Sequence, residues 1–143
     1  APYWDANSRG VLSGITRDTS PKEIVRATIE AVAYQTHDLF EAMKNDGLRP
    51  KIVKVDGGMV MNNWFSQFLS DVVNVKVLRP KVQETTALGA AFMAGLHIGV
   101  YKSLKDISRN WHEDKKFSPK MSKQSRSSLL KGWIKAIKRT LIN

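Results

Sequence analysis

The sequence lacks cysteine altogether and has only three histidines among its 143 residues. The absence of cysteine excludes disulfide bonds and thiolate metal ligands. His37, His97 and His112 are scattered, so we expect packed or solvated imidazoles and no metal site. No apolar run approaches the roughly 20 residues that span a bilayer, and no charged-then-apolar segment opens the chain. We therefore predict a cytoplasmic protein without a membrane span.

Acidic residues are scarce in the last third of the sequence, where the positive charge is concentrated. The formal net charge is +10; residues 1–100 hold 11 basic and 10 acidic side chains, whereas residues 101–143 hold 12 basic and 3 acidic ones. A nucleic-acid groove would need a basic surface on the main part of the domain. We therefore expect a solvated basic face on a C-terminal segment and no nucleic-acid partner.

Common catalytic motifs are missing as well. The sequence contains no Gly-x-x-x-x-Gly-Lys-Ser/Thr loop, no Gly-x-Ser-x-Gly elbow and no His-Glu-x-x-His pair. No pair of acidic residues resembles a hydrolase dyad. With 42% hydrophobic and 25% charged residues, the composition is nevertheless that of an ordinary globular domain. These features indicate a region that binds a ligand and does not carry out chemistry by itself.

The strongest local signal is a helix start at Ser20. The Ser20 hydroxyl can accept a hydrogen bond from the Glu23 amide while the Glu23 carboxylate accepts from the Ser20 N–H, and Pro21 suits the first helical position. A broad apolar face continues until Gly47, which can adopt the left-handed conformation that ends a helix. Before this helix, residues 10–17 alternate in a way that predicts a strand.

Strands and helices alternate further along the chain. We predict a buried strand at 52–55, a helix at about 62–72 with Phe65, Phe68, Leu69 and Val72 inward, a strand at 75–78 stopped by Arg79-Pro80, and a helix from Thr85 or Thr86 to about Gly99. Gly89 and Gly95 cost about 1 kcal/mol each inside a helix relative to alanine, so we expect close packing against another backbone there. The alternation predicts an α/β layer structure.

The last part of the chain has a different character. Residues 101–120 are irregular and polar, and a final amphipathic helix is predicted at about 125–141. Its apolar stripe comprises Leu130, Trp133, Ile134, Ile137 and Leu141. We expect this stripe to dock onto the rest of the chain and not onto a membrane surface. The predicted organisation is an α/β part at residues 1–100 and a basic C-terminal extension at residues 101–143.

The most informative candidate site begins at Asp56-Gly57-Gly58 and continues to Asn62, between a buried strand and a helix. In open α/β sheets, ligands lie beyond the carboxyl ends of the strands. Two glycines remove Cβ atoms, so a flat ring or a phosphate can approach the backbone, and helix N-terminal amides favour an anion. The same residues also fit a tight strand-to-helix turn with Asn62 as N-cap. The residues alone leave these two interpretations open.

Several segments together resemble one enzyme family. The sequence GVLSGI at residues 10–15, followed by EIVRATIE at 23–30, is similar to the C-terminal signature of the FGGY carbohydrate kinases. The segments APYWD, SRG, VDGG, ETTALGAA and Gly132-Trp133 resemble the branch of that family that phosphorylates glycerol. The similarity runs nearly end to end. Because the sequence starts with Ala1 and an interior type of loop, we expect it to be a piece of a longer chain.

The resemblance implies an actin-like ATPase (ribonuclease H-like) fold, in which this chain is a partial C-terminal domain with a mixed sheet flanked by helices. Kinases of this family transfer the γ-phosphate of Mg-ATP to a polyol or sugar hydroxyl, here glycerol, giving glycerol 3-phosphate. Matched by position, Gly58 and Asn62 fall where the family contacts the adenine nucleotide, and Gly57 supports the turn. The resemblance gives Asp56 a structural role in that turn.

The resemblance also implies what this chain lacks. The family's catalytic base, polyol-binding residues, phosphate loops and magnesium ligands lie upstream, so the region alone should be inactive. The implied partners are the missing N-terminal part of the same kinase, ATP or ADP, glycerol, and further copies in a homo-oligomer. In some bacterial members, the stretch that matches residues 119–128 docks a sugar-transport regulatory protein through acidic residues. Here it contains no acid, so neither that docking nor an intermolecular zinc site is expected.

Two alternatives remain open at this point. Another FGGY kinase, acting on a sugar such as xylulose or gluconate, would differ in substrate-binding residues that are not in this sequence. A stand-alone basic module for nucleic acid or acidic membranes would bind polyanions in a salt-sensitive way and would be indifferent to ATP.

Overall fold

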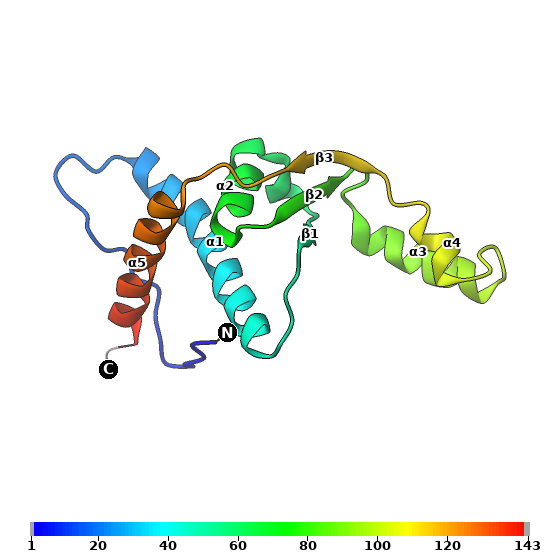
Figure 1. The fold of residues 1–143 in the computed structure, drawn as a ribbon, viewed down its shortest axis with the longest axis horizontal. Helices are drawn as coiled ribbons and strands as arrows, with labels where there is room; N and C mark the ends of the chain where they lie inside the picture. The colour runs from blue at the N-terminus through cyan, green and yellow to red at the C-terminus, as the bar shows by residue number, and fades with distance from the viewer. Residues whose placement is uncertain (1, 142–143) are drawn as a thin grey trace.

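The computed structural model describes residues 2–141. In chain order the elements are α1 (Pro21–Asn45), β1 (Ile52–Lys54), the 3-10 helix η1 (Gly58–Met61), α2 (Asn63–Val73), β2 (Lys76–Pro80), α3 (Thr85–His97), α4 (Leu104–Ser108), β3 (Glu113–Phe117) and α5 (Lys123–Thr140). The region is elongated, with α1 and α5 toward one end, the sheet and α2 in the middle, and α3 and α4 at the other end (Figure 1). Within residues 2–141, no helix is long and apolar enough to cross a membrane.

The three strands form one mixed sheet in the order β1-β2-β3. β1 pairs with β2 in parallel, with Val53 opposite Val77, and β2 pairs with β3 in antiparallel fashion, with Val77 opposite Phe117. This confirms the predicted mixed sheet flanked by helices. β2 is central and buried, whereas β1 is an edge strand in the described part of the chain, with Ile52 50% exposed. The predicted strand at 52–55 therefore exists as β1, but the prediction that it is buried is wrong.

The strand predicted at residues 10–17 is also wrong. This segment has no strand partner among residues 2–141, and its apolar side chains Val11, Leu12 and Ile15 are exposed. Gly14 has a φ of +84°, which interrupts an extended conformation. Alternation of apolar residues predicts a strand only where a neighbouring strand can pair with it.

At residues 101–120 the sequence predicts an irregular segment, whereas the structure contains α4 and β3 there. β3 reads EDKKF, and only Phe117 is buried. Charged side chains are typical of an edge strand, which shows no alternating apolar face in its sequence. β2 likewise continues beyond the predicted stop, through Arg79 to Pro80, with an irregularity in its register between these two residues.

The local helix signals, in contrast, are confirmed. Ser20 and Glu23 form the predicted capping box, in which the Ser20 N–H donates to Glu23 Oε2 at 2.8 Å. The hydrogen bond from the Ser20 side chain, followed by that from its backbone N–H, lowers the pKa of the Glu23 carboxyl. Gly47 has a φ of +86°, as expected for the end of α1. α2 begins after Asn62 and ends at Asn74, which is left-handed.

The core lies where α1, α2 and the sheet meet. The predicted inward positions of α2 are confirmed, and they join residues of α1, η1, β2 and β3 in one buried cluster: Ala33, Tyr34, Val60, Phe65, Phe68, Leu69, Val72, Val73, Val77 and Phe117. The Tyr34 and Phe68 rings meet edge to face at 5.6 Å. This contact holds α1 against α2.

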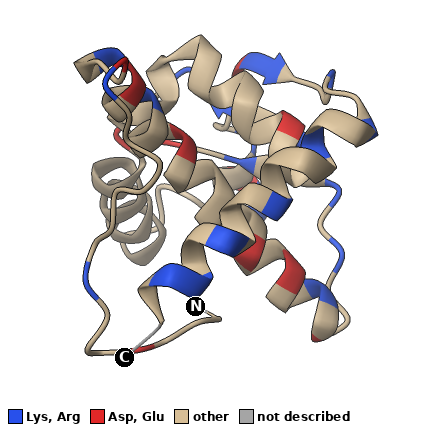
Figure 2. Ribbon diagram, turned by 90° about the vertical axis from the view of Figure 1, so that its left-hand side faces the viewer, with Lys and Arg blue, Asp and Glu red and all other residues tan. Residues whose placement is uncertain are grey.

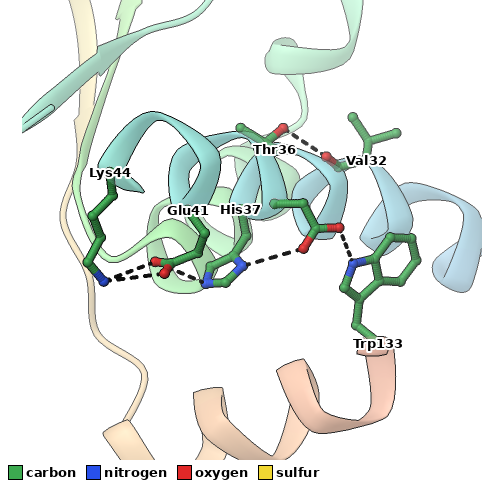
Figure 3. Close-up of polar contacts among 7 residues, drawn as sticks. Val32, Thr36, His37, Glu41, Lys44 and Trp133 are labelled. Carbon is green, nitrogen blue, oxygen red and sulfur yellow. Dashed lines mark hydrogen bonds and ion pairs between the residues drawn. The ribbon is translucent and has the colours of Figure 1, made fainter. Parts of the chain in front are cut away.

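α5 contacts this core through Trp133. Its ring stacks on Tyr34 at a centroid distance of 5.4 Å, and its Nε1 donates to Asp38 Oδ2 at 2.6 Å. Figure 3 shows Trp133 pointing from α5 toward α1. Ile137 is half-buried, but Ile134 is 46% exposed, so the prediction that Ile134 packs inward is wrong.

The two glycines of α3 differ in their surroundings. A Cβ atom at Gly95 would lie 2.8 Å from the Tyr101 ring, so the expected close contact exists there, although with a side chain. At Gly89 a Cβ atom would meet nothing within 4 Å among residues 2–141. The expectation of close packing at Gly89 is therefore not met within the described region.

We predict that Trp133→Ala lowers the free energy of unfolding by roughly 2–3 kcal/mol, below the full cost of a completely buried Trp because the ring is only partly buried. The loss combines the stacking on Tyr34 and the hydrogen bond to Asp38. Urea denaturation measures it, with Ile134→Ala on the same helix as a control that costs less than about 1 kcal/mol. Equal effects of the two substitutions would contradict the assigned packing of α5.

Candidate functional site

The candidate site is the loop that leaves β1 and enters α2. The Val55 N–H still donates to Leu78 O of β2 at 3.0 Å, so the chain separates from the sheet only at Asp56. It then forms η1 and reaches Asn62, the N-cap of α2. The loop therefore lies at the carboxyl end of a strand in a parallel pair, which is the usual place for ligands in open α/β sheets.

The two glycines of the loop have different roles. Gly57 has φ +85° and ψ 175°, a conformation that side chains rarely adopt, so the turn itself requires glycine there. Gly58 has an ordinary backbone conformation and is exposed, and a Cβ atom there would meet no atom of residues 2–141 within 4 Å. The backbone at Gly58 is therefore accessible to a flat ligand.

Asn62 satisfies the N-cap interpretation of the sequence. Its Oδ1 accepts from the backbone N–H groups of Trp64, at 2.9 Å, and Phe65, at 3.2 Å. The side chain is exposed, and its Nδ2 donates no hydrogen bond to any residue in the described range 2–141. One end of the amide thus caps α2 while the other end can donate to a ligand, so the two interpretations are compatible.

A buried arginine, which the sequence reasoning treated only as the end of a strand, holds the loop from the side of the sheet. Arg79 of β2 is 7% exposed. Its Nη1 donates to Val60 O at 2.9 Å, to Met61 O at 3.1 Å and to Asn63 Oδ1 at 3.1 Å. A charged residue that directly follows the apolar Val77 and Leu78, before Pro80, is the signal that could have identified it.

The loop itself has little charge. Asp56 is exposed, and its side chain has no hydrogen-bond partner among residues 2–141, so no hydrogen bond accounts for the structural role expected of it. Within the same range, no cluster of three or more His, Asp or Glu residues could hold a metal ion. His97 and His112 are exposed, and His37 lies 4.0 Å from Glu41 on α1 (Figure 3). Residues 56–62 thus offer a ligand exposed backbone at Gly58 and the amide of Asn62, with Asp56 as their only charged side chain.

Comparison with known proteins identifies the class. Residues 1–98 match the model of the FGGY family of carbohydrate kinases, C-terminal domain. The chain belongs to the FGGY family of carbohydrate kinases. This confirms the resemblance drawn from the GVLSGI and EIVRATIE segments.

The similar proteins include several glycerol kinases. Glycerol kinase 1 of Pseudomonas aeruginosa is 52% identical over 139 residues, which cover 97% of this chain and 28% of that protein. The structure of Plasmodium falciparum glycerol kinase with ADP is 36% identical, with a TM-score of 0.84, and is matched over 100% of this chain and 29% of that one. The gluconate kinase of Lactobacillus acidophilus is 28% identical, with a TM-score of 0.71, over 92% of this chain and 26% of that one. The chain has part of the actin-like ATPase fold and spans 28% of the length of the curated relative.

We predict that Gly57→Ala lowers the free energy of unfolding by about 1–2 kcal/mol, because alanine is strained at positive φ. Gly58→Ala should change it by less than about 0.5 kcal/mol, since the added methyl group meets nothing in this region. Thermal denaturation measures the loss of stability in each variant, and the comparison is matched because both variants gain the same methyl group. A larger loss at Gly58 than at Gly57 would show that the loop conformation described here is wrong.

Proposed function

We propose that this chain is the nucleotide-side, C-terminal part of a kinase that transfers the γ-phosphoryl group of ATP to glycerol and yields glycerol 3-phosphate. The observation that carries the proposal is the much higher identity to the Pseudomonas aeruginosa glycerol kinase than to the gluconate kinase, over nearly the whole chain in both cases. Sugar kinases of the xylulose or gluconate type are the second candidate, and no feature of this region favours them.

The basic-module alternative has less support. Figure 2 shows Lys and Arg spread over several helices and loops, with Asp and Glu among them. On α5 the exposed lysines Lys131, Lys135 and Lys138 lie beside a stripe that contacts α1, so the helix is an amphipathic cover of its own core. Positive charge on the outer side of a helix that packs on its own core fits a solvated face better than a polyanion groove.

Within the proposed kinase, we assign the adenine-nucleotide contacts to Gly57, Gly58 and Asn62. The open surface at Gly58 allows the adenine ring to lie close to the backbone, and Gly57 provides the turn that exposes it. The free Nδ2 of Asn62 can donate to a ring nitrogen of the purine. When bound, ATP supplies the phosphoryl group, and magnesium neutralises its phosphate charge through ligands that we place upstream of this region.

The remaining partners and the organisation follow from the same proposal. The preceding part of the kinase would supply the second wall of the cleft, the catalytic base and the glycerol site, so this region alone would phosphorylate nothing. We place the complete enzyme in the cytoplasm, as a homo-oligomer. Residues 1–100 would form the nucleotide-side part, and residues 101–143 the basic extension that carries α5.

We predict that Gly58→Val in the complete kinase raises the KM for ATP by at least about tenfold, while the KM for glycerol changes by less than about twofold. The valine side chain would occupy the space that the adenine ring needs. Steady-state assays with each substrate varied in turn measure both constants. Gly132→Val is the matched control: it is the same substitution at an exposed position of α5 where a Cβ meets nothing within 4 Å among residues 2–141, and it should leave both constants unchanged.

A parallel rise of the two KM values in Gly58→Val would argue against an adenine contact at Gly58. A KM for ATP equal to that of the unsubstituted kinase would also argue against this contact.

A further inference from the structure

We infer that Arg79 is a positioning residue for the nucleotide loop and that Asp114, from the C-terminal extension, orients it. The inference rests on the proposed function, because it assumes that the loop from Gly57 to Asn62 binds the nucleotide. It adds two residues that do not touch the ligand. Asp114 also lies beyond residues 1–98, the part that matches the family's C-terminal domain.

The first observation concerns the acceptors of the Arg79 hydrogen bonds. Nη1 reaches the carbonyl oxygens of Val60 and Met61, the two residues immediately before Asn62. The Val60 carbonyl accepts a second hydrogen bond, from the fully buried Ser66 hydroxyl at 2.9 Å. The stretch between the exposed Gly58 and the exposed Asn62 is thus fixed by two buried donors from β2 and α2.

The loop needs such external anchors because it has few of its own. η1 is a single short 3-10 turn, and its last hydrogen bond joins the Asn62 N–H to Met59 O at 3.2 Å. Short 3-10 turns have poorer hydrogen-bond geometry than α-helices and contribute little stability alone. The distance between Gly58 and the Asn62 amide is therefore set mainly by the anchors on Val60 and Met61.

The second observation is how Arg79 is itself oriented. Its Nε and Nη2 lie 2.8 and 2.7 Å from the same oxygen, Oδ2 of Asp114 on β3. Burying a guanidinium is costly unless it is paired and hydrogen-bonded. Here Nε and Nη2 pair with Asp114, while Nη1 donates to the carbonyl oxygens of the loop. Lysine keeps the charge but has no planar fork and cannot serve both sides in this way.

A positioning role of Arg79 and a purely stabilising role predict different effects on nucleotide binding. If Arg79 only supported the fold, its loss would lower the amount of active enzyme, and with it the apparent kcat, without changing the KM for ATP or the Kd for ADP. If it positions the loop, the variant enzyme binds adenine nucleotides more weakly while its glycerol site, built elsewhere, is unaffected. The affinity for the nucleotide is therefore the informative readout.

The experiment uses the complete kinase and four variants: Arg79→Lys, Asn63→Ala, Asp114→Asn and the matched control Glu113→Gln, an exposed acid one position away on β3. The Kd for a fluorescent ADP analogue, the KM for ATP, the KM for glycerol and the melting temperature are measured for each. We expect Arg79→Lys to raise the Kd and the ATP KM by about tenfold, the loss expected for a charged hydrogen bond. Asp114→Asn and Asn63→Ala should raise them by about threefold, since each removes one side of the network.

The glycerol KM should stay within about twofold in all variants, and Glu113→Gln should match the unsubstituted enzyme. A folded Arg79→Lys variant with unchanged affinity for the ADP analogue overturns the inference, as does an equal rise in the ATP and glycerol constants. If Arg79→Lys does not fold, Asn63→Ala and Asp114→Asn decide by the same criteria. Failure of the unsubstituted kinase to bind the ADP analogue would instead overturn the proposed function, and the inference with it.

Discussion

The contact between α2 and its two neighbours, α1 and the sheet, is the interaction on which the rest of this structure depends. Phe68 of α2 meets Tyr34 of α1, and Val72, with 1% of its surface exposed, lies in the same buried cluster as Val77 of β2. This packing fixes the start of α2 and thereby the position of Asn62 beside the end of β1. The Trp133 ring of α5 stacks on Tyr34, so the docking of α5 depends on the same cluster.

The polar edge of α2 extends this dependence to the C-terminal extension. Asp71 accepts from the backbone N–H groups of Lys120, at 2.6 Å, and Met121, at 3.1 Å, and the Ser70 hydroxyl donates to Phe117 O at 3.2 Å. These bonds hold the segment that follows β3, and β3 supplies Asp114 to Arg79. The extension is therefore tied to the nucleotide loop through β3 as well as to α1 through α5.

Sequence reasoning succeeded where the signal was local and failed where it depended on distant partners. The capping box at Ser20, the glycine turn and the Asn62 cap are complete within a few residues, and so α1, α2 and the position of the candidate site were predictable. β3 was missed because its charged residues show no apolar face. Arg79 was missed because the carbonyl oxygens it holds lie up to 19 residues before it in the sequence, and only the fold brings them together.

The central claim, that the loop from Gly57 to Asn62 contacts the adenine ring, is tested most directly by photolabelling. The complete kinase is irradiated with an ADP analogue that carries an azide on the adenine ring, and the modified peptide is identified by mass spectrometry. The account predicts a label within the peptide that contains Gly58 and Asn62, which excess ATP abolishes and glycerol does not. A label that ATP abolishes equally but that lies only in peptides outside this loop would contradict it.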